Sequence, residues 1–277
     1  MPGVPAPPLL YIDSFVRAQE SAARAAAQDM RFPQLASFLT LFVSLLAAPA
    51  AAATFSVAPT RVVLTPQATS TLLTLTNNSD AALRLQVSTH AWRQSESGEL
   101  QLSAADDLVA FPGLLTLAPG ETRRIRVAFT GTPGTLERSY RVYVEELAGA
   151  GSSSGAAVHM LTRLGIPVFV QPPKPVAAAA LRDVGLRDGR LSFTLANTGN
   201  VFFIPDDVRV RGFSASGEPV AEETPNAWYV LAGGTRRFEL AFSGEDCARV
   251  RRVAIEVVVG AVRLESGAET PGGLCGS

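Results

Sequence analysis

Residues 156–172 read AAVHMLTRLGIPVFVQP and have the pattern of a long β-strand. Apolar residues recur at alternate positions, and alternate residues of a strand face the same side of its sheet. A loop of glycine and serine, residues 149–155, precedes this stretch, and a proline-rich segment, residues 172–175, follows it. The residues on the shared face are Val158, Met160, Thr162, Leu164, Ile166, Val168 and Val170. A strand this long, placed just before a linker, can supply apolar side chains to another protein as well as to its own sheet.

The composition of the chain indicates an all-β protein. Its 277 residues are enough for one or two domains. The 24 basic and 25 acidic residues nearly balance, which argues against a nucleic-acid partner because such a surface needs clustered positive charge. Leucine and β-branched residues lie between runs of Gly, Pro, Asn and Asp, as is typical of short strands joined by turns.

Turn residues divide the chain into two series of strand-like segments. The first series comprises residues 55–64, 70–76, 83–92, 108–117, 123–129, 139–147 and the 156–172 stretch. The second comprises residues 177–186, 190–196, 201–203, 208–213, 228–231, 236–242 and 252–264. This number and spacing of strands is typical of an immunoglobulin-like sandwich. We therefore predict one such domain over residues 54–172 and another over 173–277, with the stiff PPKP segment between them.

The N-terminal region has the features of a secretory signal peptide over residues 30–53. Met30-Arg31 is followed by the apolar stretch LASFLTLFVSLLAA and then by small residues, which predicts cleavage just before Thr54 or Phe55. A stretch of about 14 apolar residues is shorter than the roughly 20 that span a bilayer, so the mature chain should have no stable membrane insertion. Because signal peptides start at their first methionine, residues 1–29 are interpreted as an upstream extension, with an amphipathic helix over residues 14–30 as the alternative.

Secretion would place the chain in an oxidising compartment, where disulfides persist. Cys247 and Cys275 are the two cysteines of the sequence, and they allow one pairing. We therefore predict a disulfide between them, with two free thiols as the alternative.

Six sequence motifs, in order, resemble those of the periplasmic pilus (fimbrial) assembly chaperones. The first four are VAPTRVVL (57–64), LAPGETRRIRV (117–127), ERSYRVYVEEL (137–147) and RLGIPVFVQP (163–172). The last two, LANTGNVFFIP (195–205) and VLAGGTRRFEL (230–240), resemble the second domain of that family. The resemblance covers nearly all of residues 55–264.

This resemblance implies two immunoglobulin-like domains in a boomerang, or L-shaped, arrangement, with no catalytic activity and a periplasmic location. Such chaperones bind pilin-like subunits that lack the last strand of their own sandwich and deliver them to an outer-membrane usher. The chaperone supplies the missing strand, a form of β-augmentation called donor-strand complementation. The donor segment here should be residues 156–164, with Val158, Met160, Thr162 and Leu164 pointing into the subunit. The free chaperone should be a monomer or a weak dimer that caps its own donor strand.

The family also holds the C-terminal carboxylate of the subunit with two basic residues, one on the first strand and one on the last strand of the first domain. Arg61 in VAPTRVVL matches the first of these positions, although a solvated strand arginine is the alternative. Counting back from Pro172, the second position falls on Pro167, which is not basic. Arg163 is the basic residue available on the same face of that strand, and an arginine pair can bind a carboxylate through charge-assisted bidentate bonds.

The sequence offers two alternative functions. Residues 151–155, GSSSG, match the G-x-S-x-G pattern of hydrolases, but that motif requires a strand, a sharp turn and a helix. His90 and His159, together with two distant cysteines, form no metal-ligand cluster, and no cofactor is predicted. A structural or adhesive secreted β-sandwich, itself a component of a surface or coat, is the remaining alternative, and self-association would distinguish it.

Overall fold

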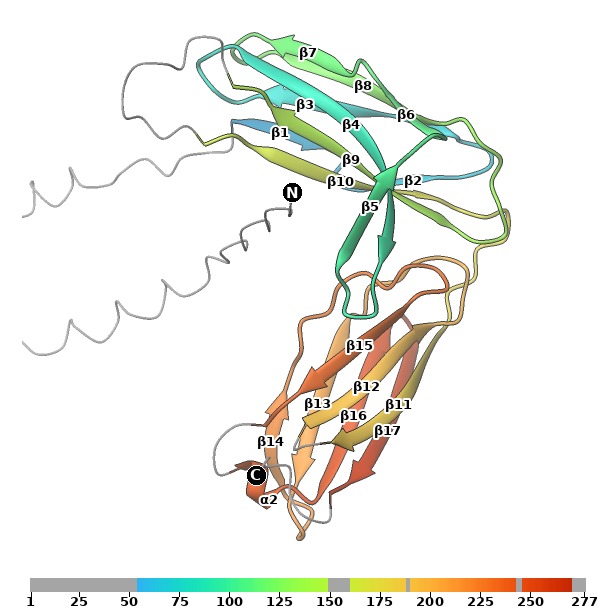
Figure 1. Cartoon of the computed structure of the whole chain (residues 1–277), viewed down its shortest axis with the longest axis vertical. Coiled ribbons are helices and arrows are strands. Elements are labelled where there is room, and N and C mark those ends of the chain that lie inside the picture. The colour runs from blue at the N-terminus through green and yellow to red at the C-terminus, as the bar shows by residue number, and fades with distance from the viewer. Residues whose placement is uncertain (1–53, 149–159, 188–189, 243–245, 271–277) are drawn as a thin grey trace, which may run out of the picture. The chain divides into compact units, whose positions relative to one another are not determined.

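The computed structural model describes residues 54–148, 160–187, 190–242 and 246–270. The chain divides into two units, Met1–Ala51 and Ala52–Ser277, and the second contains all the strands described here. The predicted extension and signal peptide, the glycine-serine loop, Val158 and Cys275 lie outside the described residues. Within the described part, β-strands dominate and a single helical turn, α2 (Asp246–Arg249), accompanies them (Figure 1).

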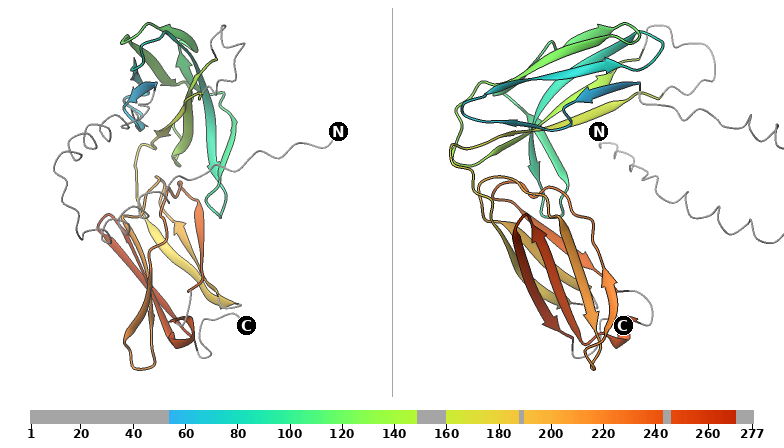
Figure 2. Two further views of the ribbon diagram at one scale, coloured as in Figure 1. Left: turned by 90° about the vertical axis from the view of Figure 1, so that its left-hand side faces the viewer. Right: turned by 180° about the vertical axis from the view of Figure 1, so that it is seen from behind.

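The first sandwich is built from two sheets that pack face to face. Its strands are β1 (Phe55–Ala58), β2 (Val62–Leu64), β3 (Ser70–Asn77), β4 (Leu83–Gln94), β5 (Leu100–Ala104), β6 (Leu108–Phe111), β7 (Leu114–Leu117), β8 (Thr122–Phe129), β9 (Arg138–Glu146) and β10 (Arg163–Val170). One sheet has the order β1-β3-β8-β6, and the other has the order β2-β10-β9-β4-β5, with β7 also paired to β4. The two layers can be followed from both sides in Figures 1 and 2.

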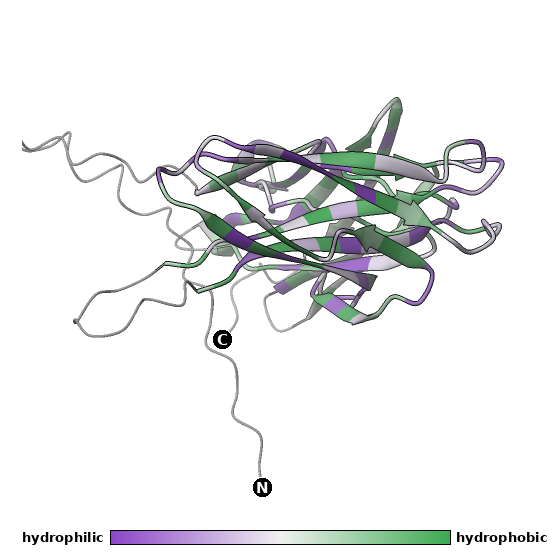
Figure 3. Cartoon of the chain, turned by 90° about the horizontal axis from the view of Figure 1, so that it is seen from above, coloured by the Kyte–Doolittle hydropathy of each residue, from purple (hydrophilic) through white to green (hydrophobic). Residues whose placement is uncertain are grey.

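Alternation of apolar and polar residues explains why these segments form two-sided strands. On β8 the buried residues Ile125 and Val127 alternate with exposed arginines, and on β9 Val142 and Val144 are fully buried. Successive strand residues face opposite sides, so each strand places one apolar row in the core and one polar row outside. Figure 3 shows this alternation as bands of hydrophobic and hydrophilic residues along the strands. The apolar rows of both sheets meet in one core cluster.

Two segments expected to be single strands are each divided in the structure. Residues 55–64 form β1 and β2, which belong to different sheets, and residues 108–117 form β6 and β7. In both cases a proline, Pro59 or Pro112, lies at the break, because proline has no N–H group to donate to a sheet. Strand β5 was not predicted.

The second sandwich contains β11 (Ala179–Arg187), β12 (Arg190–Asn197), β13 (Asp207–Phe213), β14 (Pro219–Glu223), β15 (Thr235–Leu240), β16 (Arg252–Val259) and β17 (Val262–Glu269). Its sheets have the orders β11-β12-β15 and β14-β13-β16-β17. The expected strand 252–264 is instead a hairpin that turns at Gly260, whose φ of 56° suits glycine. The predicted strands 201–203 and 228–231 reduce to one isolated bridge between Phe203 and Val230. Strand β14 was not predicted.

The prediction of an all-β chain with two immunoglobulin-like sandwiches is confirmed. For the site described below, the important element is β10. It pairs antiparallel with β9 along its whole length but parallel with β2 only over Val168–Val170. The first half of β10 therefore has β9 on one side and, among the described residues, no strand on the other.

Candidate functional site

The predicted donor face changes from exposed to buried along β10. Met160 precedes the strand and is 84% exposed, whereas Leu164 is half-buried against the core of the first sandwich. Ile166, two residues further along the same face, is buried in that core. The row therefore runs from the domain interior towards solvent, with Thr162 interrupting its apolar residues, and its role as a donor strand stays a prediction.

Thr162 marks the point where the regular pairing of this strand begins. The Glu146 N–H donates to the Thr162 carbonyl oxygen at 2.9 Å, and the Thr162 N–H donates to the Glu146 carboxylate at 3.4 Å. The Thr54 hydroxyl donates to the same carboxylate at 2.9 Å and lies 3.2 Å from the Thr162 hydroxyl. Glu146 therefore connects the first described residue of the chain to the beginning of β10.

Arg163 is engaged with its own neighbours. It lies directly opposite Glu145 on β9 and forms an ion pair with it. Its guanidinium also lies 3.9 Å from the centre of the Tyr143 ring. That ring covers Gly165, where an added Cβ atom would lie 2.7 Å from a Tyr143 ring carbon, so glycine is required at this close approach.

Pro167 lies between two arginines from the neighbouring strands. Arg141 of β9 is its direct cross-strand partner. On the other side, Val62 pairs with Val168 in the parallel register, so Arg61 and Pro167 are the residues that immediately precede this pair. Directly paired residues point to the same face of a sheet. The position predicted for a basic residue is thus occupied by proline, whose cross-strand partner is Arg141, while Arg61 immediately precedes β2 on the other side of β10.

An aromatic cluster supports both arginines. It contains Trp92 of β4, Phe169 of β10, and Phe202 and Tyr229 from the second sandwich, with Leu231 beside them. The Phe169 and Phe202 rings are stacked with their centres 3.8 Å apart. The Arg141 guanidinium lies 4.0 Å from the Trp92 ring centre, and the Arg61 guanidinium lies 5.7 Å from that of Phe202. Both separations are within the roughly 6 Å over which a ring face attracts a cation, and the Arg141 contact is the closer of the two.

Arg141 has few polar partners for a charge in its position. Its Nη1 donates to the Gly165 carbonyl oxygen at 3.2 Å, and its Nε atom is buried with no hydrogen-bond partner. Burial lowers the pKa of the Arg141 guanidinium below its ordinary value, although the group remains charged. Within the described part of the chain, neither Arg61 nor Arg141 forms an ion pair.

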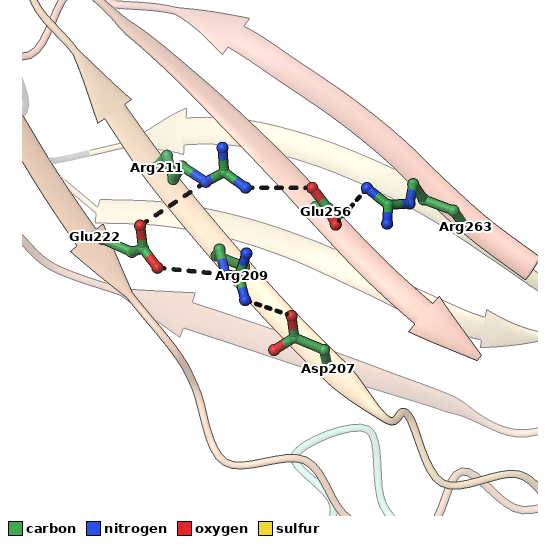
Figure 4. A network of polar contacts seen from close by, with 6 residues as sticks. All are labelled: Asp207, Arg209, Arg211, Glu222, Glu256 and Arg263. Carbon is green, nitrogen blue, oxygen red and sulfur yellow. Dashed lines mark hydrogen bonds and ion pairs between the residues drawn. The ribbon is translucent and has the colours of Figure 1, made fainter. Parts of the chain in front are cut away.

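Other strand arginines are neutralised locally. On the second sandwich, Figure 4 shows Arg209 and Arg211 of β13 between the carboxylates of neighbouring residues and strands. The ion pairs join Arg209 to Asp207 and Glu222, Arg211 to Glu222 and Glu256, and Arg263 to Glu256. Ion-paired arginines therefore occur in both sandwiches, although several other described arginines, Arg236 among them, form no ion pair, as is the case for Arg61 and Arg141.

Glu137 adds a buried carboxyl group close to the aromatic cluster. The side chain is only 5% exposed; its Oε1 accepts a 2.8 Å hydrogen bond from the Phe202 N–H, and its Oε2 has no partner. Burial raises the pKa of Glu137 to about 7, against an ordinary value of 4.5. The Glu137 N–H also donates to the Asn200 carbonyl oxygen at 2.9 Å. The carboxyl group therefore joins the start of β9 to the segment that carries Phe202.

Residues 54–175 match the family model described as pili and flagellar-assembly chaperone, PapD N-terminal domain. Over its first sandwich, the chain belongs to the family of pilus assembly chaperones. Members of this family are chaperones and not enzymes. No curated protein matches the sequence of this chaperone significantly.

Solved structures of other pilus chaperones share the fold. The CsuC–CsuE chaperone–tip adhesion subunit complex of Acinetobacter baumannii is 19% identical with a TM-score of 0.53, and the match covers 78% of this chain and 98% of that one. The E. coli chaperone DraB is 19% identical with a TM-score of 0.50, and the match covers 76% of this chain and 95% of DraB. The Salmonella enterica SafA pilin–SafB chaperone complex is 14% identical with a TM-score of 0.50, and the match covers 77% of this chain and 96% of that one. At these identities the similarity shows the fold of this chaperone.

The sequence interpretation placed Arg61 at the site but did not include Arg141, Trp92 or Glu137. Arg141 lies within the motif ERSYRVYVEEL, but only the strand register shows that it faces Pro167.

The predicted disulfide remains a prediction: Cys247 is buried in the second core and the described residues contain no free cysteine, while Cys275 lies outside them.

The described residues contain no cluster of three or more His, Cys, Asp or Glu side chains that can hold a metal ion. Among the same residues, no helix has the length and apolar character needed to cross a membrane.

Proposed function

We propose that this chaperone acts in the periplasm, where it binds pilin-like subunits by donor-strand complementation and delivers them to an outer-membrane usher. The observation that carries the proposal is the state of β10. One edge of Arg163–Pro167 has no partner strand among the described residues, and the adjoining Met160 side chain is exposed. A subunit that lacks its last strand offers the complementary surface, namely an apolar groove beside an unpaired sheet edge.

The exposed donor residue gives a measurable share of the expected binding energy. Burial of a methionine side chain contributes about 1.5–3 kcal/mol, which corresponds to roughly 10- to 100-fold in affinity. Met160 and Leu161, which is 54% exposed, precede β10, and extension of the strand through them in a complex would place Met160 on the face of Leu164 and Leu161 on the opposite face. An aspartate at position 160 would place a charge in the groove, but one at position 161 would not.

The test is periplasmic co-expression of the tagged chaperone with each small secreted β-subunit encoded beside it. The wild type and the matched control Leu161→Asp should capture a subunit, and Met160→Asp should not. Circular dichroism of the purified variants checks that both are folded. Equal capture by the two aspartate variants, or no capture by the wild type, would refute the proposal.

The localisation proposal rests on residues 30–53 acting as a signal peptide. Cleavage before Thr54 would keep the Thr54 hydroxyl bond to Glu146, and cleavage before Phe55 would remove it. We therefore expect the mature chain to begin at Thr54, which intact-mass analysis of the periplasmic fraction would establish. A mature chain that retains residues 1–29 would contradict the proposed processing. Sedimentation should find the free chaperone as a monomer or weak dimer rather than a polymer.

A further inference from the structure

We propose that the β4–β5 hairpin is a strut that docks on the edge of β15 and holds the two sandwiches in one orientation. The inference does not depend on the proposed function. Four observations support it: the extension of the hairpin beyond its own sheet, the contact that its turn makes, a second turn of the same type in open surroundings, and a separate set of bonds between the sandwiches.

The hairpin extends beyond the sheet that carries it. Pairing of β4 with β9 ends at Ala91 and Tyr140, whereas pairing of β4 with β5 continues to Gln94 and Leu100. The two strands therefore leave the sheet together as a ribbon, which Figure 1 shows. Every residue of β5 is exposed, and an isolated two-stranded ribbon is at best marginally stable in water. A contact at the far end of the ribbon would supply the support that its own sheet does not.

Strand β15 of the second sandwich supplies this contact. The Arg237 N–H donates to the Glu96 carbonyl oxygen at 2.7 Å. Among the described strands β15 pairs only with β12, so it is an edge strand, and such an edge presents N–H groups that need a partner. The turn of the hairpin thus covers part of this edge with a main-chain hydrogen bond.

Gly98 allows the turn to approach β15 closely. Its φ of 88° lies in the left-handed region, and an added Cβ atom would lie 3.3 Å from the Arg236 Nε atom. Arg236 is itself fixed, because its Nη2 donates to the Asn226 carbonyl oxygen at 3.1 Å and its guanidinium lies 5.1 Å from the centre of the Phe238 ring. Phe238 is buried in the second core. The turn therefore rests on a side chain that is held against that core.

The β13–β14 hairpin contains a turn of the same type in different surroundings. Residues 95–99 read SESGE, and residues 214–218 read SASGE. In both turns the glycine N–H donates to the carbonyl oxygen of the first serine at 3.0 Å, and the φ angles of Gly98 and Gly217 are 88° and 83°. An added Cβ atom at Gly217, however, would meet no atom within 4 Å. The turn chemistry alone does not produce docking, and Gly217 is a matched control for Gly98.

A second set of bonds joins the sandwiches near the start of β9. The Glu137 N–H donates to the Asn200 carbonyl oxygen at 2.9 Å, and the Glu137 Oε1 accepts the Phe202 N–H at 2.8 Å. The Asn200 side-chain amide donates to the Thr135 carbonyl oxygen at 3.1 Å. These bonds use other segments of both sandwiches than the strut does. A body attached at one place can rotate about it, so a second attachment by the strut removes this freedom.

Residual dipolar couplings of the nitrogen-15-labelled chaperone test the strut directly. Two sandwiches held as one body share one alignment tensor, and two that move independently do not. The wild type should give a shared tensor. Two variants should give separate tensors: Gly98→Asn, whose side chain would displace Arg236, and a shortened hairpin in which Asn-Gly replaces residues 94–100 as a tight turn. A shared tensor in the shortened variant would overturn the proposal.

Two further variants distinguish the strut from general damage to a hairpin. Gly217→Asn places the same residue in the same type of turn, so it carries similar backbone strain but should keep the shared tensor. Glu96→Ala should keep it as well, because the main chain of residue 96 makes the contact, and this change makes the two turn sequences identical. If Gly217→Asn separates the tensors as much as Gly98→Asn does, or if Glu96→Ala separates them, the assignment is wrong.

Amide hydrogen exchange gives a second readout at the contact itself. Successive residues of an antiparallel strand point their N–H groups to alternate edges, so Arg237 donates to the hairpin and Phe238 points towards β12. Shortening the hairpin should speed exchange of the Arg237 N–H by about tenfold or more and leave that of Phe238 nearly unchanged. Unchanged exchange at Arg237 in the shortened variant would show that the hairpin does not dock on β15 in solution.

Discussion

Replacing Glu137 by glutamine should change how the stability of the chaperone depends on pH. Glu137 is almost fully buried, and its Oε1 accepts the Phe202 N–H at 2.8 Å. Glutamine has the shape of the protonated carboxyl group and retains an oxygen for this bond, but it carries no charge at any pH. The substitution therefore removes the titration and leaves the contact in place.

The size and sign of the effect follow from the pKa. Burial raises the Glu137 pKa from 4.5 to about 7, and each pKa unit corresponds to about 1.36 kcal/mol. Below pH 4.5 the folded and unfolded chains both hold the proton. Between pH 4.5 and about 7 the unfolded chain releases the proton first, so the free energy of unfolding falls as pH rises. Above that range the wild type carries a penalty of about 3 kcal/mol that Glu137→Gln lacks.

Urea unfolding of the mature wild type and variant across this pH range measures the difference. The two unfolding free energies should be close near pH 4.5, and the variant should be more stable by about 3 kcal/mol at about pH 8. Glu99→Gln, at an exposed position, is the matched control and should follow the wild type. Parallel profiles for wild type and Glu137→Gln, or a variant that is less stable at the higher pH, would refute the reasoning.

Three further substitutions test the packing and the cost of the site. The buried Asn77 side chain donates to three main-chain carbonyl groups, so Asn77→Ala should destabilise the chain by about 2–4 kcal/mol in urea unfolding; a loss near zero would contradict this. At Gly199 an added Cβ atom would lie 2.2 Å from a main-chain oxygen, so Gly199→Ala should lower the Tm by several degrees. The control is Gly185→Ala, where an added Cβ atom would meet no other atom within 4 Å, and it should lower the Tm much less. Arg141→Met loses the cation–π contact with Trp92, which destabilises the chain, but it also removes a buried donor that has no acceptor, which stabilises it. The two effects oppose one another, so the stability of the variant should stay within about 1 kcal/mol of the wild type. A clear loss of stability in thermal unfolding would disprove this.

The alternation of apolar residues was sufficient to predict most strands and both cores. Strands β3, β8 and β9 each carry one buried row, so their period of two is visible without any knowledge of their partners. Strand β5 has no such signal, because all five of its residues are exposed. The division of residues 55–64 at Pro59 was not predicted, and the sheet that each half joins depends on pairing with residues far away in the sequence.

From the residues alone, the candidate site was predictable where it lies on a single strand, and Arg61 was added only through the resemblance of VAPTRVVL to a family motif. Met160 and Leu164 were identified because they share the face of one continuous segment. Arg141 was not identified, because its position opposite Pro167 depends on the register between β9 and β10. The sequence of residues 149–159, which connects these strands, contains no turn motif from which that register could be deduced. Trp92 and Phe202 are further away in the sequence, and their contacts with the arginines arise only when the strands are assembled.

The two parts of the predicted site, the donor row and the carboxylate anchor, would together determine how a subunit strand is aligned. Met160 lies seven residues before Pro167, which is about 23 Å along an extended strand. A subunit carboxylate held at Arg61 would fix one end of the added strand, and the apolar row that begins at Met160 would accept its partner side chains at a set distance from that end. A shift of one residue would turn every apolar side chain to the wrong face, and a shift of two would leave the carboxylate out of reach of Arg61 or the exposed apolar row unfilled. Such an anchor would contribute register as well as affinity, so lengthening the C-terminus of a bound subunit by one residue should cost more affinity in a pull-down titration than the loss of any single apolar contact.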